Sequence, residues 1–424
     1  MSFRFLIDRS RALFLFAFLS LAALSVAAQT SYDERREIFE QVWTLIDEKY
    51  YDASFNGVDW RAVKMKYAAR IDAASNDRDF YALLDRMAGE LRDSHTRVYS
   101  PAQRDERRNQ KRAEIGVGLK EIGGAVVIFS VAPGSEAARA GIRPGMIVRA
   151  VNGRPIKKAV ADAQRAVGVS SSERATRMRV LSKILSGAPE TVLKLELTDA
   201  NGVKLKFALT RRPMSSKPSV AARRLPSGIA YLKFGVFSEE FEKEIENALR
   251  DFRDAPALVI DLRGNGGGDG DVGLRFAGHF FDDRITIAKI VTRDGKPPLP
   301  EIPLTLETGA KNGRIFSRPV AILVNEGTAS TAELVTNAFQ ERRRAVVFGT
   351  NSCGCVLAFL DYKPLKGGGD LSFSEFGFVT ANGKRLEGAG VVPDRIVPLR
   401  LEDVRAGRDR ALDEAELFLR KSIE

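Results

Sequence analysis

The fold of this chain is decided by the stretch RPVAILVNEGTASTAELVTNAFQ, which runs from Arg318 to Gln340. Its apolar run ends in Asn325-Glu326-Gly327, which predicts a buried strand followed by a tight turn. Apolar residues then recur at helical spacing just after Ser330. The pattern therefore predicts a strand, a turn and a helix, with a serine at the turn.

Ser330 stands where this helix would begin. The first turn of a helix offers free backbone N–H groups and the positive end of the helix dipole. Both stabilise the oxyanion that forms when a hydroxyl attacks a carbonyl, so Ser330 is a candidate nucleophile. The alternative is that Ser330 or Thr331 only caps the helix, because Ser and Thr are preferred at that position.

The composition is that of a globular protein with several domains. A length of 424 residues predicts two or three domains, and 44% hydrophobic with 29% charged residues excludes a disordered chain. The formal charge is +11, but the basic residues are scattered among many acids rather than gathered in one run. A nucleic-acid partner is therefore not expected.

The first 28 residues predict a secretory signal peptide. Three arginines precede an apolar run from Ala12 to Val26, and Ala28 suits cleavage before Gln29. An exported protein, periplasmic or secreted, with no stable membrane span after signal cleavage is the expectation. An uncleaved membrane anchor is the alternative.

The remaining chain divides into four parts by its patterning. Helical spacing predicts an N-terminal helical domain over residues 29–110, and short strands and turns predict a β-rich module over residues 111–212. Strands alternate with helices in residues 213–400, which predicts an α/β domain with a largely buried sheet. Residues 401–424 predict one charged amphipathic helix docked on that core.

A glycine-rich segment follows an apolar strand of the predicted α/β domain, with the sequence Asp261-Leu262-Arg263-Gly264-Asn265-Gly266-Gly267-Gly268. Glycines let a backbone approach a ligand closely, and their N–H groups can bind an anion. The segment is not a P-loop, because Lys and Ser/Thr do not follow the glycines. A plain flexible turn is the alternative.

The only two cysteines are Cys353 and Cys355, which are separated by Gly354. Disulfide geometry disfavours a bridge between residues so close in sequence, so reduced packing residues are expected, with a labile redox pair as the alternative. No histidine lies nearby in sequence, and no metal site is predicted.

Part of the β-rich module resembles a PDZ domain. The resemblance lies in Ile115-Gly116-Val117-Gly118-Leu119, in Pro133-Gly134-Ser135, in Gly141-Ile142-Arg143-Pro144-Gly145 and in Asn152-Gly153. It implies that Gly116, Val117, Gly118 and Leu119 offer backbone N–H groups to a peptide C-terminal carboxylate, beside a strand edge that pairs with the peptide. The alternative is that the module packs against its neighbours and binds nothing. Residues 161–183 predict a helical insertion.

Three blocks resemble the signatures of the carboxyl-terminal processing (tail-specific) protease family. They are Asp261-Leu262-Arg263-Gly264-Asn265-Gly266-Gly267, then Asn325-Glu326-Gly327-Thr328-Ala329-Ser330-Thr331-Ala332-Glu333, then Gly388-Ala389-Gly390-Val391-Val392-Pro393-Asp394. A helical segment and a PDZ-like module precede them in the family's order. The resemblance covers nearly the whole mature chain. It implies a crotonase-like (ClpP/crotonase) α/β core and a serine peptidase that acts on polypeptides without a cofactor, with Ser330 as nucleophile.

One departure from the family pattern concerns the catalytic base. Ser-Lys members resemble this chain but carry a lysine 25 positions after the nucleophile, where Cys355 stands here. A thiol does not replace a lysine amine in acid-base behaviour or reach. The tricorn-like branch instead has a Ser-His pair after the helical region and a glutamate before the last block, and Ser94-His95 and Glu387 match those places.

This resemblance implies a Ser-His-Glu mechanism. His95 would take the proton of Ser330, and Glu387 would orient His95 or its neighbour Ser94. Backbone N–H groups of Gly266 or Gly267 and of Thr331 would hold the oxyanion. The alternatives are that His95 only caps a helix C-terminus and that Glu387 is a surface turn acid.

The leading hypothesis is therefore an exported serine endopeptidase whose PDZ-like module selects or gates polypeptide substrates through their C-termini. A catalytically inactive peptide-binding scaffold on the same fold is one alternative, because Cys355 replaces the lysine. An enzyme that uses Cys355 as a redox or auxiliary group is another. The sequence does not predict the oligomeric state.

Overall fold

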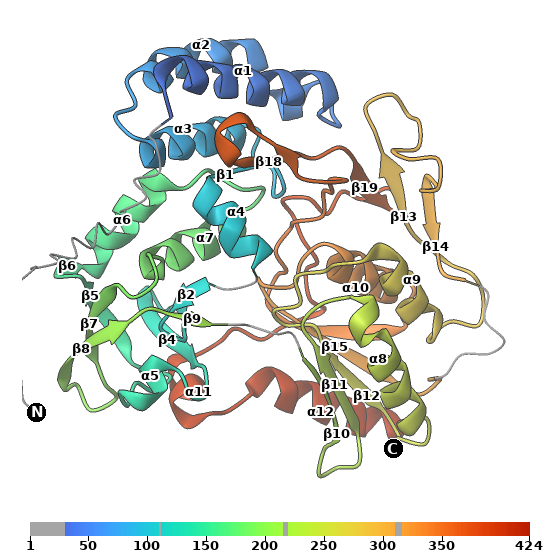
Figure 1. The fold of residues 1–424 in the computed structure, drawn as a ribbon. Coiled ribbons are helices and arrows are strands. Elements are labelled where there is room, and N and C mark those ends of the chain that lie inside the picture. The colour runs from blue at the N-terminus through green and yellow to red at the C-terminus, as the bar shows by residue number, and fades with distance from the viewer. Residues whose placement is uncertain (1–29, 110–111, 215–218, 310–315) are drawn as a thin grey trace, which may run out of the picture.

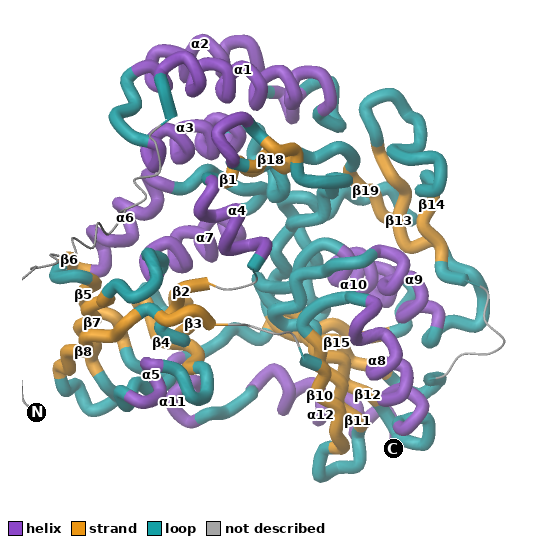
Figure 2. The backbone as a smooth tube through the Cα atoms, in the orientation of Figure 1, coloured by secondary structure: helices purple, strands orange, loops and turns teal. Residues whose placement is uncertain are grey.

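The computed structural model describes residues 30–109, 112–214, 219–309 and 316–424. The predicted signal peptide lies outside these residues. Three regions are visible in Figures 1 and 2: N-terminal helices, a β-rich module and an α/β core. The predicted multidomain α/β fold class is confirmed. Within the described ranges, no helix combines the length and apolarity that a membrane crossing requires.

The N-terminal region is built from three helices that begin at capping side chains. Ser31, Asp59 and Asn76 each accept a backbone N–H from the first turn. The helices are α1 (Tyr32–Lys49), α2 (Trp60–Asp72) and α3 (Asp77–Gly89), with the short 3₁₀ helix η1 (Phe55–Gly57) between α1 and α2. Their apolar faces share one buried cluster with Leu371 and Phe373. This core is therefore completed by residues from the far end of the chain.

A three-stranded sheet ties the helical region to the rest of the protein. Strand β1 (Arg97–Tyr99) pairs antiparallel with β18 (Asp370–Ser372), which pairs with β17 (Lys363–Pro364) near the 3₁₀ helix η2 (Lys366–Gly368). Ser372 Oγ also donates to the backbone carbonyl of His95 at 2.6 Å. The pairing holds the segment that carries His95 against the α/β region.

The β-rich module is a twisted sheet flanked by helices. Its strands follow the order β3-β4-β5-β7-β8, and β6 pairs with β5. The strands are β3 (Val117–Ile122), β4 (Ala125–Val131), β5 (Ile147–Val151), β6 (Arg154–Pro155), β7 (Val192–Thr198) and β8 (Lys204–Thr210). The helices are α5 (Glu136–Arg139), α6 (Ile156–Ala166) and α7 (Glu173–Leu185), and a two-stranded ladder of β2 (Arg112–Glu114) and β9 (Arg212–Met214) borders the module.

The α/β core holds a six-stranded sheet in which only the β10–β11 pair is antiparallel. Its strands, in spatial order, are β10 (Val220–Arg224), β11 (Ala230–Phe234), β12 (Leu258–Asp261), β15 (Val320–Val324), β16 (Ala345–Gly349) and β20 (Arg395–Ile396). The helices of one face are α8 (Glu239–Asp251), α9 (Gly270–Gly278) and α10 (Thr331–Glu341). A small sheet of β14 (Thr305–Glu307), β13 (Thr286–Val291) and β19 (Gly377–Thr380) lies beside them.

Three details differ from the sequence expectations. The C-terminal segment forms two helices, α11 (Leu401–Ala406) and α12 (Arg410–Ile423), because Gly407 adopts a left-handed conformation between them. The predicted docking of this segment on the core is confirmed, since Ala415 and Leu419 of α12 are buried against the second face of the sheet.

The other two differences lie nearer the N-terminus. The insertion expected at residues 161–183 is two helices, α6 and α7. An unexpected helix, α4 (Pro101–Arg108), follows β1 and is capped by Ser100.

Candidate active site

Ser330 lies between β15 and α10 in an unusual backbone conformation. It is the N-cap residue of α10, with φ 56° and ψ −127°. An ordinary N-cap residue adopts an extended conformation, and a non-glycine residue rarely adopts a positive φ. Such strain is concentrated at functional sites. The backbone of Ser330 therefore favours a functional role over capping alone.

The glycine-rich segment and the turn that carries Ser330 are tied together. Asn325 Oδ1 accepts the N–H groups of Gly264 and Gly327, at 3.0 and 2.9 Å. A Cβ placed on Gly267, which has φ +90°, would lie only 2.6 Å from Cβ of Ser330. Only glycine allows this approach. The glycine-rich backbone thus lies directly against the carbon that bears the hydroxyl.

A buried carboxylate, Glu333, organises the backbone around the nucleophile. It accepts four hydrogen bonds, from the N–H of Ser330 (3.1 Å), Ser352 Oγ (2.5 Å), the N–H of Gly354 (2.7 Å) and the N–H of Cys355 (2.8 Å). Burial raises the pKa of Glu333, although all four donors oppose that shift. Sequence reasoning missed this role. The signal was available, because Ser330 and Glu333 have the spacing of a capping box.

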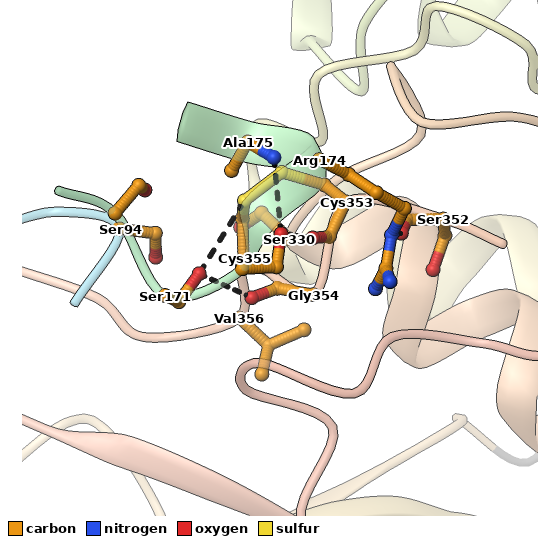
Figure 3. Close-up of a disulfide and its surroundings, with 12 residues drawn as sticks. Ser94, Ser171, Arg174, Ala175, Ser330, Ser352, Cys353, Gly354, Cys355 and Val356 are labelled. Carbon is orange, nitrogen blue, oxygen red and sulfur yellow. Dashed lines mark hydrogen bonds between the residues drawn. A yellow bond between two sulfur atoms is a disulfide. The ribbon is translucent and has the colours of Figure 1, made fainter. Parts of the chain in front are cut away.

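The two cysteines form a disulfide (Figure 3), which corrects the expectation of reduced packing residues. Their Cα atoms lie 5.2 Å apart, within the range that a disulfide requires. The physical reason is Gly354, whose φ of 71° lets the chain turn back between them. Cys355 therefore offers no free thiol in this state.

The disulfide segment contacts both the nucleophile and the β-rich module. The carbonyl of Cys355 accepts the N–H of Ser330 at 2.8 Å. Ser171, just before α7, donates from Oγ to the carbonyl of Gly354 at 2.6 Å and lies 3.8 Å from Sγ of Cys355, as Figure 3 shows. The module is therefore packed against the backbone that positions Ser330.

His95 is held in a tight turn after α3. Its Nδ1 lies 2.6 Å from Ser94 Oγ, and its backbone N–H donates to Asp93 Oδ1 at 2.7 Å. Burial lowers the pKa of the imidazole below its ordinary value, while the charge of Asp93 opposes the shift. The ring is therefore neutral at neutral pH, the form that a general base requires. Across the described ranges, no hydrogen bond joins His95 to Ser330.

Glu387 links the turn of the imidazole to the segment after the disulfide. Its Oε1 accepts the N–H of Ser94 at 3.1 Å. Its Oε2 accepts the N–H groups of Val356 and Leu357, at 2.6 and 3.2 Å. Burial, reinforced by the charge of Asp93, raises the pKa of Glu387 to about 7. The carboxylate contacts the backbone of Ser94 rather than the imidazole, and it is not a free surface acid.

The three predicted oxyanion donors differ in their present hydrogen bonds. The N–H of Thr331, at the first position of α10, has no acceptor among the residues that the structure describes. The N–H of Gly266 donates to the carbonyl of Gly235 at 3.3 Å, and that of Gly267 donates to Asn265 Oδ1 at 2.9 Å. Either glycine would have to exchange its acceptor to bind an oxyanion.

The predicted peptide-binding residues 116–119 lie at the start of β3. Within the described part of the chain β3 pairs only with β4, so its other edge has no strand partner. Arg177 of α7 forms an ion pair with Glu121 of β3 at 2.5 Å. Lys120 of the same strand pairs with Glu326 in the turn before the nucleophile, at 2.7 Å. The edge strand is thus connected to the site.

An α/β core with a strained serine at a strand–helix turn, a half-buried histidine and a peptide-type binding module together define the class of a serine peptidase. Comparison with known proteins is consistent with this class. Residues 228–397 match peptidase family S41, residues 31–89 match the tricorn protease C1 domain and residues 127–182 match a PDZ domain. The chain therefore carries a peptidase family S41 domain together with a tricorn C1 domain and a PDZ domain, and its relatives include carboxyl-terminal-processing proteases, as the three sequence blocks predicted.

Relatives and solved structures agree with this placement. The chain is 28% identical over 380 residues to a carboxyl-terminal-processing protease of Synechocystis sp., covering 87% of this chain and 82% of the relative. It is 27% identical to a chloroplastic carboxyl-terminal-processing peptidase 2 of Arabidopsis thaliana, and the match covers 86% of this chain and 69% of the relative. The structure of a photosystem II D1 C-terminal processing protease shares the fold, with a TM-score of 0.57 and 23% identity over 87% of this chain and 94% of that one.

These findings establish the activity class. The protein is a serine-type peptidase, a hydrolase with a PDZ domain and polypeptide substrates. None of these similarities favours a catalytically inactive scaffold over an active peptidase. The roles of the individual site residues remain predictions.

Proposed function

We propose that Ser330 and His95 carry out acyl transfer on a polypeptide substrate. The Oγ of Ser330 attacks the scissile carbonyl carbon, and its proton passes to Nε2 of His95. The N–H groups of Thr331 and Gly267 hold the resulting oxyanion. To do so, the N–H of Gly267 gives up its hydrogen bond to Asn265 Oδ1. The protonated imidazole then gives its proton to the leaving amine, which departs from the acyl-enzyme.

Water completes the cycle through the same groups. The neutral imidazole takes a proton from water, and the hydroxide attacks the acyl carbonyl carbon. Collapse of the second tetrahedral intermediate breaks the ester bond, and the proton returns to Ser330 Oγ. The Oγ of Ser94 accepts a hydrogen bond from Nδ1–H of His95. The lone pair of the imidazole is then on Nε2, where it can take the proton of Ser330. Glu387 positions Ser94 through its backbone.

One observation carries this proposal: an unbroken set of short contacts runs from the serine turn to the imidazole turn. The N–H of Ser330 donates to the carbonyl of Cys355, and the next residue, Val356, donates to Glu387. Glu387 in turn accepts the N–H of Ser94. Because substrate often tightens catalytic contacts that are long in its absence, we expect the imidazole to reach Ser330 in the substrate complex.

Cleavage of an unfolded polypeptide tests the nucleophile. Purified wild-type protein should convert unfolded casein to peptides, and the Ser330→Ala variant at the same concentration and with the same melting temperature should not. Equal turnover by the two proteins would reject Ser330 as the nucleophile.

The edge of β3 supports a second part of the proposal, that the PDZ domain binds substrate C-termini. A peptide added as a strand would pair with the backbone of residues 116–119, while its carboxylate meets their N–H groups. Hydrogen exchange on the Ser330→Ala variant tests this. A peptide with a free carboxylate should protect the amides of residues 117–119 more than its amidated form does, and equal exchange with and without peptide would contradict it.

Export is the third part of the proposal. The predicted signal peptide and the disulfide between Cys353 and Cys355 support an oxidising compartment, such as the periplasm or the cell exterior. Expression of the full chain in a bacterium, followed by fractionation and N-terminal sequencing, should give a mature protein that begins at Gln29. A cytoplasmic protein with an intact first residue would contradict export.

A further inference from the structure

A cavity of about 450 Å³ opens where the helical region, the α/β core and the PDZ domain meet. This volume lies within the range of small-ligand sites. Its wall includes Ser171, Leu357 and Glu387, which all belong to the contacts around the disulfide segment or the imidazole turn. The cavity therefore adjoins the backbone that positions Ser330.

Two arginines, Arg92 and Arg385, line this cavity. Both are exposed, and neither guanidinium makes a hydrogen bond or an ion pair with any residue in the described part of the chain. Arg92 adopts a positive φ of 52° three residues before His95, and Arg385 lies two residues before Glu387. Each of these two site residues thus has, two or three positions before it in sequence, a cation that lines the cavity.

The acids that line the same cavity are already satisfied. Glu90 accepts Lys66 Nζ at 2.7 Å and the hydroxyl of Tyr67 at 2.8 Å. Glu387 is occupied by three backbone N–H groups. Asp52 does not line the cavity, but its charge interacts with that of Arg385, and its carboxylate accepts hydrogen bonds from Ser54 and Asn56. The acids of this region therefore bond to other donors, and the N–H groups of the two guanidinium groups stay available to a ligand.

The rest of the wall is suited to a peptide chain. Leu357, Phe378 and Val291 supply apolar surface. A planar guanidinium binds a carboxylate through two parallel hydrogen bonds, which gives both affinity and orientation. A mixed wall, in which apolar side chains stand with two arginines, suits an amphipathic segment that ends in, or carries, a carboxylate.

We propose that this cavity is a carboxylate-binding subsite of the peptidase, in which Arg385 and Arg92 bind a substrate carboxylate and so determine specificity. The carboxylate comes either from the C-terminus of the polypeptide or from an Asp or Glu side chain near the scissile bond. A role in specificity rests on the proposed peptidase function, but binding of the carboxylate can be measured without catalysis.

The test uses the mature Ser330→Ala protein and fluorescein-labelled peptides taken from the sequence of casein, chosen without reference to cleavage. One peptide has a free C-terminal carboxylate, a second is amidated, and a third has its Asp and Glu replaced by Asn and Gln. Fluorescence anisotropy gives the dissociation constant of each. Loss of a charge-assisted pair should weaken binding by about tenfold or more.

Arg385→Gln and Arg92→Gln should each raise the dissociation constant of the carboxylate peptide, and Lys384→Gln is the matched control. Lys384 is an exposed cation next to Arg385 in sequence but does not line the cavity. Weakening by amidation alone, if it disappears in the arginine variants, identifies the C-terminus as the source and separates this cavity from the PDZ domain. Weakening by the Asn and Gln replacements alone identifies acidic side chains. The peptide form that has lost its carboxylate should bind the arginine variants and the parent equally.

Equal binding of all three peptides, or unchanged affinity in both arginine variants, would overturn the subsite. Failure of the proposed catalytic function has a different signature, because the wild type would not cleave while binding kept its dependence on Arg385. In cleavage assays the arginine variants should raise KM and leave kcat little changed, since the guanidinium contacts are made in both ground and transition states.

Discussion

The carbonyl oxygen of Cys355 accepts the backbone N–H of Ser330 at 2.8 Å. The position at which Ser-Lys relatives carry a lysine therefore lies directly against the nucleophile, and a disulfide occupies it here. We therefore propose that the base that activates Ser330 comes from another element. His95, which β1 and β18 hold near the core, is the residue whose surroundings suit that task.

Glu333 should be essential for the stability of the site. Glu333→Ala removes the acceptor of four hydrogen bonds and leaves buried donors unsatisfied. Each unsatisfied buried group costs about 1–3 kcal/mol, so we expect the free energy of unfolding to fall by at least about 3 kcal/mol in urea titrations. The exposed Glu244→Ala is the control and should stay within about 0.5 kcal/mol of wild type. A similar small change in both variants would show that Glu333 does not organise this backbone.

Gly267→Ala should abolish activity while Gly270→Ala does not. An added Cβ at Gly267 would meet Cβ of Ser330 at 2.6 Å and the carbonyl of Ala329 at 2.7 Å, whereas Gly270 has open space. Because a displacement of about 1 Å costs on the order of a hundredfold in rate, labelling of Ser330 by a fluorophosphonate should slow by at least that factor. Labelling of Gly267→Ala at the wild-type rate would contradict the close approach of the two turns.

The disulfide should support the site without taking part in the chemistry. Glu333 and Ser330 hold the backbone of residues 352–355 by hydrogen bonds that do not involve sulfur. The double variant Cys353→Ser with Cys355→Ser should therefore keep its rate of substrate cleavage within about tenfold of wild type, equivalent to roughly 1.4 kcal/mol. Complete loss of cleavage in a folded double variant would instead favour an auxiliary role for Cys355.

The pH dependence should report Glu387. Its pKa is raised from 4.5 to about 7, and the mechanism requires its carboxylate together with a neutral His95, whose own pKa is lowered. We expect kcat/KM to rise as pH passes through about 7 and this rise to disappear in Glu387→Gln. The free energy of unfolding should instead fall as pH rises from about 4.5 to 7. In that range Glu387 is still protonated in the folded state but already ionised in the unfolded state. A rise of kcat/KM that persists unchanged in Glu387→Gln would exclude this assignment.

Local patterns predicted the elements that hold the nucleophile. The strand at residues 345–349 and the strand, turn and helix around Ser330 are confirmed, because each is a short apolar run next to a clear turn signal. The position of His95 depends instead on the pairing of β1 with β18, which lies far away in sequence. The local pattern of apolar residues does not predict a pairing between two strands so far apart in sequence.

The rest of the site could not be predicted for reasons specific to its residues. The disulfide depends on the positive φ of Gly354, and a sequence does not specify that conformation. The present acceptors of the Gly266 and Gly267 N–H groups depend on how the glycine-rich segment folds against Gly235 and Asn265. Arg92 and Arg385 come together only when three regions meet around one cavity.

The most direct test of the account is the rate of fluorophosphonate labelling at Ser330 in His95→Ala. Removal of a general base costs about 10²–10⁴ in rate, so labelling should fall by that factor in a variant that keeps the melting temperature of wild type. Ser330→Ala gives the background of the assay. Labelling of folded His95→Ala at the wild-type rate would contradict the claim that this imidazole activates Ser330.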